Sequence, residues 1–240
     1  MKIALVGYGK MGKLLAQKVR EKGWEVSAIV DPFWEQGLKD IAGIKADIAI
    51  EFTRPDTAVN NLLKLAEEKI PTVCGTTGWY EKLPEVKAAF EKAGSKLLYS
   101  SNFSLGVNLF YKICEYAAAL LDPMAFYDVA AYEVHHNQKA DSPSGTAKTL
   151  AEKVLAKMTR KQRAVYEMLN RKPAPEELHF PSLRVGSMPG IHALVFDSPA
   201  DTIEIKHTNR NREGLADGAL FAAEWLARQG SGIYTLDDAI

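Results

Sequence analysis

The chain begins Met1-Lys2-Ile3-Ala4-Leu5-Val6 and passes directly into Gly7-Tyr8-Gly9-Lys10-Met11-Gly12, and this junction decides the fold. The apolar run predicts a buried strand, and the residues that follow have the pattern of an amphipathic helix over 11–22. The glycines fit the spacing GxGxxG at a turn from strand to helix. Glycine-rich turns also arise for steric reasons alone, so the spacing by itself leaves the function open.

Asp31 gives the glycine motif its context. It stands about 20 residues after Gly12, at the end of a second predicted strand over 25–30, where a carboxylate can accept hydrogen bonds from an adenosine ribose. The sequence therefore predicts a dinucleotide site, although Asp31 is also an ordinary turn residue before Pro32. The negative charge would repel a 2′-phosphate, so we expect NADH to be preferred over NADPH, with Lys39 or Arg54 able to weaken that preference.

Strand-like and helical segments alternate through the first hundred residues, which predicts a doubly wound parallel sheet of the Rossmann type. Ligands of such sheets bind outside the carboxyl ends of the strands. Two loops fall there, Gly75-Thr76-Thr77 and Ser100-Ser101-Asn102-Phe103, although polar loops of this composition are also common as simple turns. The predicted strands are 2–6, 25–30, 47–52, 72–74 and 96–99, and the predicted helices are 11–22, 55–69 and 82–93.

A second informative stretch runs from Glu133-Val134-His135-His136 through Lys139 to Ser144-Gly145-Thr146-Ala147. A predicted strand over 126–134 precedes the histidines, and Ser144 fits the N-cap of a helix that continues to about residue 158. Unpaired backbone N–H groups and a partial positive charge at a helix start can bind a carboxylate or phosphate. The stretch therefore predicts an anion site with an acid/base group.

Two other interpretations of the histidines remain open. They can be the solvated end of a strand, or they can bind a metal, because neutral imidazole is a common ligand. Adjacent strand residues point to opposite faces, however, and Cys74 and Cys114 stand alone without ligand spacing. We therefore expect no metal site.

Composition limits the class of protein. The 240 residues include 30 basic and 30 acidic side chains, and this balance gives no indication of a nucleic-acid partner. Two separated cysteines fit a reducing cytoplasm, and no apolar stretch approaches the roughly 20 residues that cross a membrane. We expect a cytoplasmic protein whose partner is a small molecule.

The second half of the chain predicts a separate α+β domain with an open mixed sheet. Its four strands are expected at 126–134, 183–185, 192–196 and 202–207, with helices on one side, and His192 and His207 on these strands are interpreted as structural or interface residues. The charged stretch 160–177 is predicted to be partly helical. Helices over 105–121 and 215–228 bound a dinucleotide-binding domain of residues 1–105 plus 213–240 and a substrate-binding and oligomerisation domain of residues 106–212.

Taken together, these motifs resemble the 4-hydroxy-tetrahydrodipicolinate (dihydrodipicolinate) reductase family of lysine and diaminopimelate biosynthesis. The resemblance covers essentially the whole chain. It implies NAD(P)H-dependent reduction of a cyclic dicarboxylate, by hydride transfer and histidine-mediated protonation, in a homotetramer. The matching motifs are Gly7 to Gly12, Phe52 to Pro55, Gly75 to Gly78, Ser101 to Asn108, Glu133 to His136 with Lys139 and Asp141, Pro143 to Thr146, Leu183 to Gly186 and Gly190 to His192.

The resemblance also implies a role for each matching residue. His135 and Lys139 would be catalytic, and His136, Gly145 and Thr146 would bind the substrate carboxylates. The cofactor would be held by Gly7, Gly9, Lys10, Met11, Gly12, Asp31, Gly75, Thr76, Thr77, Ser100, Ser101, Asn102 and Phe103.

The chain departs from the family pattern at Gln138, where many relatives carry a basic residue, and at Ser142, where alanine is usual. Neither change touches His135 or Lys139. Two rival functions remain, another small two-lobed NAD(P)-dependent dehydrogenase of an amino-acid pathway and a non-catalytic dinucleotide sensor. The histidine and lysine segment argues against both, since a sensor needs no proton donor.

Overall fold

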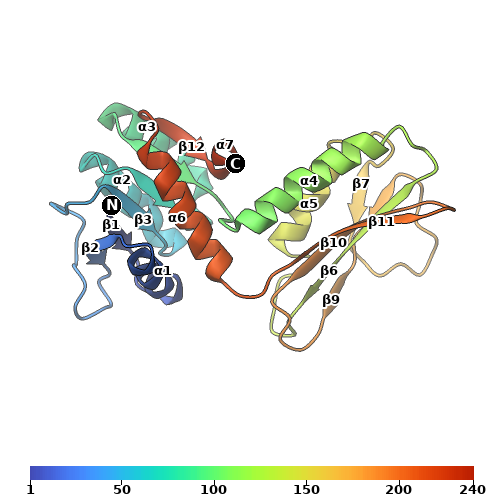
Figure 1. The fold of residues 1–240 in the computed structure, drawn as a ribbon, viewed down its shortest axis with the longest axis horizontal. Coiled ribbons are helices and arrows are strands. Elements are labelled where there is room, and N and C mark those ends of the chain that lie inside the picture. Colours follow the sequence, from blue (N-terminus) through green and yellow to red (C-terminus); the bar gives the residue numbers. More distant parts are fainter. The chain divides into compact units, whose positions relative to one another are not determined.

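The computed structural model describes all residues from Met1 to Ile240, and the chain divides into two compact units (Figure 1). Unit 1 contains Met1–Leu105 and Glu213–Ile240, and unit 2 contains Gly106–Arg212. Unit 1 has one sheet and unit 2 has two, and each unit has its own helices. Unit 1 is therefore built from both ends of the chain, whereas unit 2 is continuous.

Unit 1 contains a six-stranded sheet in which every neighbouring pair is parallel. The inner strands are almost wholly apolar and buried, as expected for a parallel sheet that is covered on both faces. In spatial order the strands are β12 (Gly232–Thr235), β5 (Lys96–Tyr99), β4 (Thr72–Cys74), β3 (Ile48–Glu51), β1 (Lys2–Val6) and β2 (Glu25–Val30).

Helices cover both faces of this sheet, and alternate residues of β1 show the division. Ile3 and Leu5 pack in a cluster with α1 and α6, whereas Ala4 and Val6 pack in another cluster with α2 and α3. The doubly wound arrangement predicted from the alternating segments is thus present. The helices are α1 (Lys10–Glu21), α2 (Pro55–Glu67), α3 (Leu83–Ala93), α6 (Glu213–Ala227), the short α7 (Leu236–Ala239) and a 3₁₀ turn over Tyr80–Lys82.

Unit 2 contains a four-stranded mixed sheet in the order β11-β10-β6-β9. The central pairings are antiparallel, and β9 joins β6 in parallel. Helices α4 and α5 pack on one face of the sheet around Val129, Ala131, Leu194 and Phe196. The elements are α4 (Leu105–Leu121), β6 (Asp128–His135), α5 (Gly145–Leu155), β9 (Ser182–Arg184), β10 (Ile191–Asp197) and β11 (Thr202–Thr208).

Two segments differ from the sequence prediction. The stretch 160–177 is not helical, because β7 (Arg163–Val165) pairs in parallel with β8 (Glu177–His179) and forms a separate two-stranded sheet. The C-terminal residues form β12 and α7, neither of which the sequence indicated, and β12 extends the sheet of unit 1 beside β5. Both misses involve strands of three or four residues, which are defined by a distant partner rather than by a pattern of their own.

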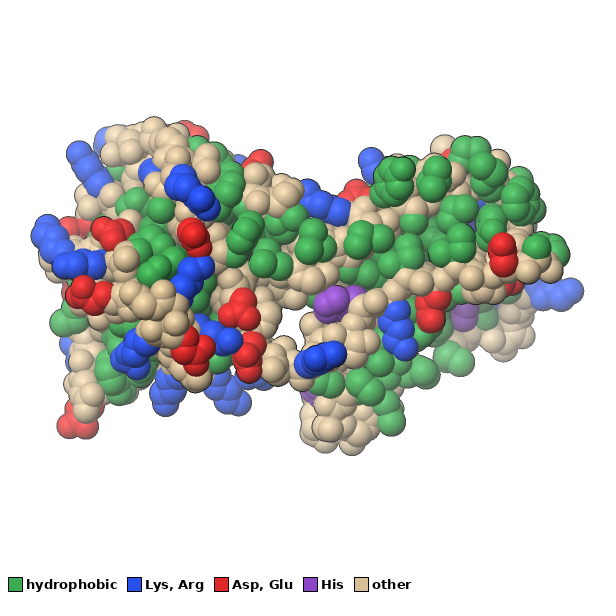
Figure 2. Space-filling view, viewed as in Figure 1, with side chains coloured by type: hydrophobic (Ala, Val, Ile, Leu, Met, Phe, Trp, Pro, Cys, Tyr) green, Lys and Arg blue, Asp and Glu red, His purple; other side chains and the backbone are tan.

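The outer face of α4 carries an apolar stripe. Leu109, Ile113, Tyr116 and Leu120 recur at helical spacing, and their exposed fractions lie between 46% and 72%. Hydrophobic side chains gather over this helix in the space-filling view (Figure 2). No helix in the structure combines the length and the apolar character that a membrane span requires.

Candidate active site

The glycine loop between β1 and α1 is held tightly by backbone contacts. Gly7 has a φ of +95°, and a Cβ atom there would lie 2.2 Å from the carbonyl oxygen of Phe52. A Cβ atom on Gly12 would lie 2.1 Å from the carbonyl oxygen of Gly7. Helix α1 starts after Gly9 without a side-chain cap, so its first N–H groups are left to bind an anion.

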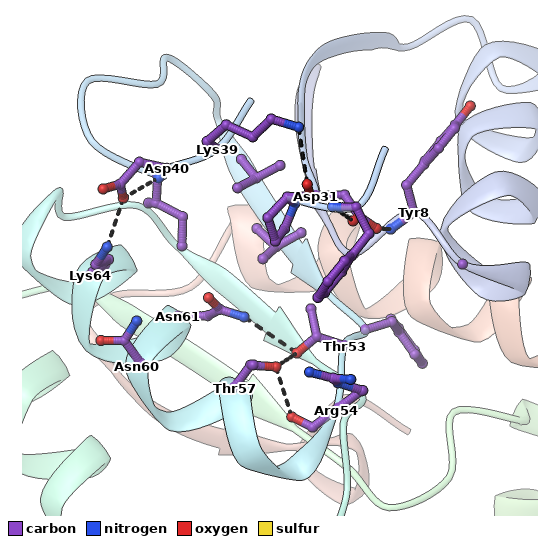
Figure 3. A pocket seen from close by; sticks show the side chains of 18 residues that line it. Tyr8, Asp31, Lys39, Asp40, Thr53, Arg54, Thr57, Asn60, Asn61 and Lys64 are labelled. Atoms are coloured by element: carbon purple, nitrogen blue, oxygen red, sulfur yellow. Dashed lines mark hydrogen bonds and ion pairs between the residues drawn. The ribbon is translucent and has the colours of Figure 1, made fainter. Parts of the chain in front are cut away.

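Asp31 lies at the end of β2 and is bonded to the glycine loop. One carboxylate oxygen accepts a hydrogen bond from the backbone N–H of Tyr8 at 2.7 Å, and the other accepts one from that of Phe33 at 2.8 Å. Asp31 also lines a cavity of about 380 Å³ that reaches the glycine loop (Figure 3). The carboxylate therefore joins the turn after β1 to the turn after β2 on the wall of this cavity.

Two cationic side chains, Lys39 and Arg54, line the same cavity as Asp31. Lys39 donates to the backbone oxygens of Pro32 and Trp34, at 3.1 Å each, and Arg54 lies 5.5 Å from the ring centre of Phe33. An aromatic ring, a guanidinium group and a carboxylate together suit an adenosine. The cavity also includes Asn60, Asn61 and Lys64 of α2, which sequence reasoning did not single out because a helix face gives no local motif.

A second cavity of about 420 Å³ joins the glycine loop to the loop after β4. A Cβ atom on Gly75 would lie 2.1 Å from the ring of Phe52, and Thr76 Oγ1 accepts a hydrogen bond from the backbone N–H of Thr53 at 2.7 Å. Two predicted cofactor loops thus meet at the carboxyl ends of neighbouring strands. The lining residues are Gly9, Lys10, Met11, Phe52, Thr53, Pro55, Gly75, Thr76 and Thr77.

The third predicted cofactor loop, Ser100 to Phe103, lies beside these residues without lining either cavity. The backbone N–H of Ser100 donates to the carbonyl oxygen of Cys74 at 3.2 Å, and the rings of Phe103 and Phe52 are 5.9 Å apart. Ser100 Oγ also accepts from the backbone N–H of Asn102 at 3.2 Å, which makes a compact turn. The loop is close to the second cavity, but Ser100 and Asn102 bond the loop's own backbone, Phe103 is buried in the core and Ser101 is exposed.

In unit 2 the two adjacent histidines lie in different surroundings. His135, the last residue of β6, faces the buried side of the sheet and is 6% exposed, whereas His136 lies just beyond the strand and is half-buried. Lys139 pairs with Asp141 at 2.7 Å. Ser144 caps α5 as predicted, since its side chain accepts the N–H of Ala147 at 3.1 Å, and Gly145 and Thr146 form the first turn.

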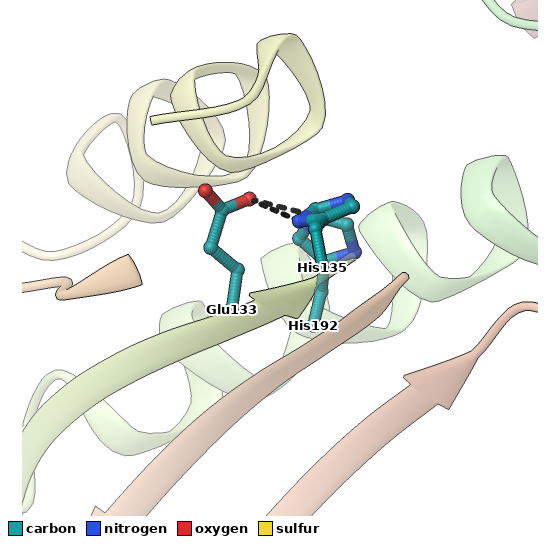
Figure 4. A group of neighbouring side chains, drawn as sticks. All are labelled: Glu133, His135 and His192. Carbon is teal, nitrogen blue, oxygen red and sulfur yellow. Dashed lines mark hydrogen bonds and ion pairs between the residues drawn. The ribbon is translucent and has the colours of Figure 1, made fainter. Parts of the chain in front are cut away.

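A buried carboxylate, Glu133, lies at the centre of this region. Its Oε1 accepts hydrogen bonds from the backbone N–H of Ser144 at 3.0 Å and from the hydroxyl group of Ser182 at 2.6 Å. Its Oε2 accepts from the Ser144 hydroxyl group and lies 3.2 Å from His192 Nε2 and 3.4 Å from His135 Nδ1 (Figure 4). Glu133 therefore connects both imidazoles to the start of α5.

The strand register explains how these groups meet. Glu133 and His135 are two residues apart on β6, so both point to the same face. Across the sheet, Ser182 of β9, Glu133 of β6, His192 of β10 and His207 of β11 lie directly opposite one another. A polar row therefore crosses the buried face of the sheet, with His135 and Arg184 on one side of it and the apolar residues of the core on the other.

Electrostatics divides the row into charged and neutral members. Burial alone would raise the pKa of Glu133, but hydrogen bonds from His192, Ser144 and Ser182 outweigh it and hold that pKa well below its usual range. Burial lowers the pKa of His135 to about 4, with Glu133 acting in the opposite direction. Burial, followed by the nearby His192, also lowers the pKa of His207. At neutral pH Glu133 is ionised and His135 is neutral.

Sequence reasoning missed the roles of Glu133 and His192 in this cluster. The one available signal was the position of Glu133 two residues before His135, because pairing with His192 depends on strand register. The three ligand atoms of Glu133, His135 and His192 lie within 4.8 Å of one another, which is a spacing that a metal ion could also use. Both oxygens of Glu133 already accept hydrogen bonds from serine groups, however, and these would compete with a metal.

Unit 1 combines a parallel sheet with a glycine loop and a nucleotide-sized cavity. Unit 2 is an α+β unit with a buried cluster of imidazole and carboxylate groups. Together they define a two-unit nucleotide-dependent oxidoreductase.

Solved structures share this architecture. A dipicolinate-bound dihydrodipicolinate reductase from Paenisporosarcina sp. TG-14 aligns with a TM-score of 0.83 at 23% identity, over 100% of this chain and 99% of that one. An amine dehydrogenase from Mycobacterium smegmatis aligns with a TM-score of 0.60 at 14% identity, over 99% and 95%.

The family follows from sequence comparison. The family model for the dihydrodipicolinate reductase N-terminus matches residues 1–103, and the model for the C-terminus of the same family matches residues 106–240. A 4-hydroxy-tetrahydrodipicolinate reductase from Christiangramia forsetii is 35% identical over all of this chain and 98% of its own length. One from Staphylococcus aureus is 36% identical over 99% of this chain and 100% of its own length. The chain belongs to the dihydrodipicolinate reductase family.

Proposed function

We propose that this chain reduces 4-hydroxy-tetrahydrodipicolinate to tetrahydrodipicolinate with NAD(P)H, in the diaminopimelate and lysine pathway. The observation that carries the proposal is the family match over both units, which includes the whole segment from Glu133 to Ala147. Relatives that are 35% and 36% identical over nearly their full length are 4-hydroxy-tetrahydrodipicolinate reductases. Residues 1–105 plus 213–240 would bind the dinucleotide, and residues 106–212 would bind the substrate and form the oligomer.

In unit 1 the residues around both cavities fit a dinucleotide. The free N–H groups at the start of α1 would hold its phosphates, and Asp31 would contact the ribose. Gly75, Thr76 and Thr77 would line the nicotinamide side, with Ser100, Ser101, Asn102 and Phe103 behind them. When bound, the reduced nicotinamide supplies the hydride.

In unit 2 the substrate needs two anion sites and a proton. His136, Gly145 and Thr146 would hold its carboxylates, because the start of α5 offers unpaired N–H groups and a partial positive charge. His135 would give a proton to the enamine that hydride addition leaves, and Lys139 would assist proton transfer and contact the substrate. A dianionic substrate would raise the low pKa of His135 on binding, which favours the protonated donor in the complex.

NADH oxidation coupled to the product of the preceding synthase tests this function. Wild-type protein should oxidise NADH, and His135→Gln should lower kcat by about 10² to 10⁴-fold, the range for loss of a general acid. His179→Gln is a matched control, because His179 bonds the backbone oxygen of Glu167 at 3.1 Å and lies outside the cluster. Cofactor binding by an inactive wild-type protein would favour the dinucleotide sensor instead, and full activity of His135→Gln would remove the role of His135.

A planar pyridine dicarboxylate should inhibit competitively with the substrate. The structural neighbour from Paenisporosarcina was solved with dipicolinate bound, and a rigid dicarboxylate of that kind matches the pair of anion sites assigned to unit 2. Steady-state inhibition kinetics with the wild-type protein measure the effect. Uncompetitive or absent inhibition would contradict the assignment of the carboxylate sites.

We assign a preference for NADH over NADPH, because the Asp31 carboxylate on the cavity wall would repel a 2′-phosphate. Lys39 and Arg54 line the same cavity and act in the opposite direction. The kcat/KM ratio of the two cofactors measures the balance, and Asp31→Asn should move that ratio toward NADPH. A wild-type protein that favours NADPH would mean that the two cations outweigh Asp31.

We propose a homotetramer formed through unit 2, as the family resemblance implies. The sheet face opposite α4 and α5 carries Val134, Leu183, Ile191 and Val195 at partly or fully exposed positions, and this surface supports association between copies. Sedimentation velocity measures the mass, and Leu183→Lys should weaken the assembly. A monomer at micromolar concentration would contradict the proposal.

A cytoplasmic location is proposed from the cysteines. Cys74 and Cys114 are both buried and unpaired, which fits a reducing compartment. Cell fractionation with antibody detection measures the location directly. Recovery of the protein with the extracellular or periplasmic fraction would contradict it.

A further inference from the structure

We propose that Glu133 is a positioning residue that orients the His135 ring so that Nε2 transfers the proton, and that His192 shares the same Glu133 oxygen and limits its support of a charged His135. The proposal rests on the proton-transfer role assigned above to His135. It adds two residues that would act on the reaction without touching the substrate.

The first support is the single oxygen that both rings face. Glu133 Oε2 lies 3.4 Å from His135 Nδ1 and 3.2 Å from His192 Nε2, and the two rings are 5.1 Å apart in an edge-on arrangement. Glu133 and His192 are 0% and 1% exposed, so water does not screen them. One carboxylate oxygen thus serves two imidazoles in a region of low effective dielectric constant, where electrostatic contacts are strong.

The second support is that the two nitrogens of His135 differ. Nδ1 is buried, has no hydrogen-bond partner and faces the carboxylate at 3.4 Å. A charge-assisted N–H bond to a carboxylate is usually about 2.7–2.9 Å long, so this contact has room to shorten when the ring gains a proton. Nδ1 is therefore committed to Glu133, and Nε2 is the nitrogen left for a substrate.

Gly190 keeps the Nε2 side of the ring clear. This residue has a φ of +150°, and a Cβ atom there would lie 3.1 Å from His135 Nε2 and 3.1 Å from Asn209 Nδ2. Any larger residue would press on the nitrogen that transfers the proton. The turn before β10 thus leaves space around His135 Nε2, the nitrogen that does not face Glu133.

The proton balance is simple. The Nε2–H bond of the charged ring breaks, the electron pair of the substrate enamine forms a new C–H bond, and His135 becomes neutral with its remaining proton on Nδ1 toward Glu133. Glu133 stays ionised throughout, as a carboxylate that stabilises an imidazolium ion does. His135 then regains its proton from solvent.

The charged groups around His135 predict opposite pKa shifts for the removal of Glu133 and the removal of His192. Glu133 on β6 is the group that favours the charged ring, whereas burial, His192 on β10, Lys139 after β6 and Arg184 on β9 all disfavour it. Lys139 is partly neutralised by Asp141, and Arg184 lies 3.7 Å from Glu133 Oε1. Removing the Glu133 charge should lower the pKa of His135, and removing His192 should raise it.

The test compares Glu133→Gln, His192→Phe and a control, Glu177→Gln. Glutamine keeps an oxygen for the Ser144 and Ser182 donors, and phenylalanine keeps a ring beside His135. Glu177 is also buried in unit 2, but it bonds Arg163, Arg171 and the backbone N–H of Ala174. The readouts are single-turnover rates with the synthase product between about pH 5 and 9, and ¹⁵N NMR of the imidazoles in the protein without substrate.

For a general acid, the rate falls as pH rises through the pKa of the ring in the complex. Glu133→Gln should move this falling limb of the pH–rate profile to lower pH by about one unit, which is a tenfold loss of rate at pH values above the pKa. His192→Phe should move the limb to higher pH. Glu177→Gln should change neither the pH–rate profile nor the ¹⁵N signals of His135. Wild-type NMR should find the neutral His135 with its proton on Nδ1.

Three results would overturn the inference. The first is a neutral His135 with its proton on Nε2 in the folded wild type, and the second is a pH–rate limb that moves the same way in Glu133→Gln and His192→Phe. The third is an equal loss of rate in Glu133→Gln and Glu177→Gln without a pH shift, which would reduce Glu133 to a structural role. The NMR readout needs no turnover, so an inactive wild type with the Nδ1 tautomer would reject the proposed function and leave the orientation by Glu133 intact.

Discussion

The glycine loop of unit 1 and the histidine row of unit 2 assemble polar groups in different ways. In unit 1 these polar groups are mainly backbone amides from a few consecutive residues, held by close packing such as that of Gly12 against Gly7. In unit 2 they are side chains from different strands that meet inside a sheet. A site of the first kind depends on local chain geometry, and a site of the second kind depends on burial and strand register.

The largest effect should come from adding one methyl group to the glycine loop. Gly12→Ala puts a Cβ atom 2.1 Å from a backbone oxygen, so we expect a loss of about 3 kcal/mol in the free energy of unfolding and weak cofactor binding. Gly9→Ala meets no atom within 4 Å and should change stability by about 0.5 kcal/mol at most, yet it should weaken cofactor binding at least tenfold by crowding the phosphates. Denaturant unfolding and fluorescence titration measure both. Equal stability losses would show that the loop is not held by backbone contact.

A second effect tests the burial of the histidine row. The pKa of His135 is lowered to about 4 in the folded protein, so the unfolded chain binds more protons between that pH and about 6.5. Stability should therefore fall as pH drops from about 6.5 to 4, by about 3 kcal/mol before solvent screening and about 2 kcal/mol after it.

His135→Gln should flatten this part of the curve, and His207→Gln should flatten it less, since burial lowers that pKa too. Urea unfolding at several pH values measures the slope. A slope that is unchanged in both variants would mean that the row is hydrated rather than buried.

The smallest effect should come from removing one hydrogen-bonding hydroxyl group in each unit. Ser182→Ala removes a 2.6 Å hydrogen bond to the buried, ionised Glu133 and should cost about 1.5 kcal/mol. Thr235→Ala removes the exposed side-chain half of the capping box of α7, a 2.8 Å hydrogen bond to Asp238, and should cost about 0.7 kcal/mol. Thermal unfolding ranks the two. The reverse order would contradict the greater importance of side-chain bonds in unit 2.

The same contrast explains what the sequence could predict. Strands β1 to β5 follow from apolar runs, and the glycine loop with Asp31 follows from spacing, because both signals lie within short windows. The four residues of β12 are only half-buried and carry no such signal until β5 lies beside them. The stretch 160–177 resembled a helix because it is charged, but β8 supplies a strand partner for part of it.

The candidate site divides in a similar way. His135, Lys139 and the start of α5 are close in sequence and could be singled out together. The meeting of Glu133 with His192 and Ser182 could not, because it requires three strands in one register. Likewise, Asn60, Asn61 and Lys64 reach the first cavity only through the packing of α2.

The discontinuity of unit 1 has a consequence for synthesis. Helix α6 fills one side of its core with Ala216, Ala219, Ala223 and Leu226, and β12 completes its sheet. A ribosome releases the first five strands long before these residues exist, while unit 2 emerges in one continuous piece. Unit 1, although its first strands are made first, must therefore be last to close, and until then one apolar face of its sheet is only partly covered and stays open to chaperones and proteases.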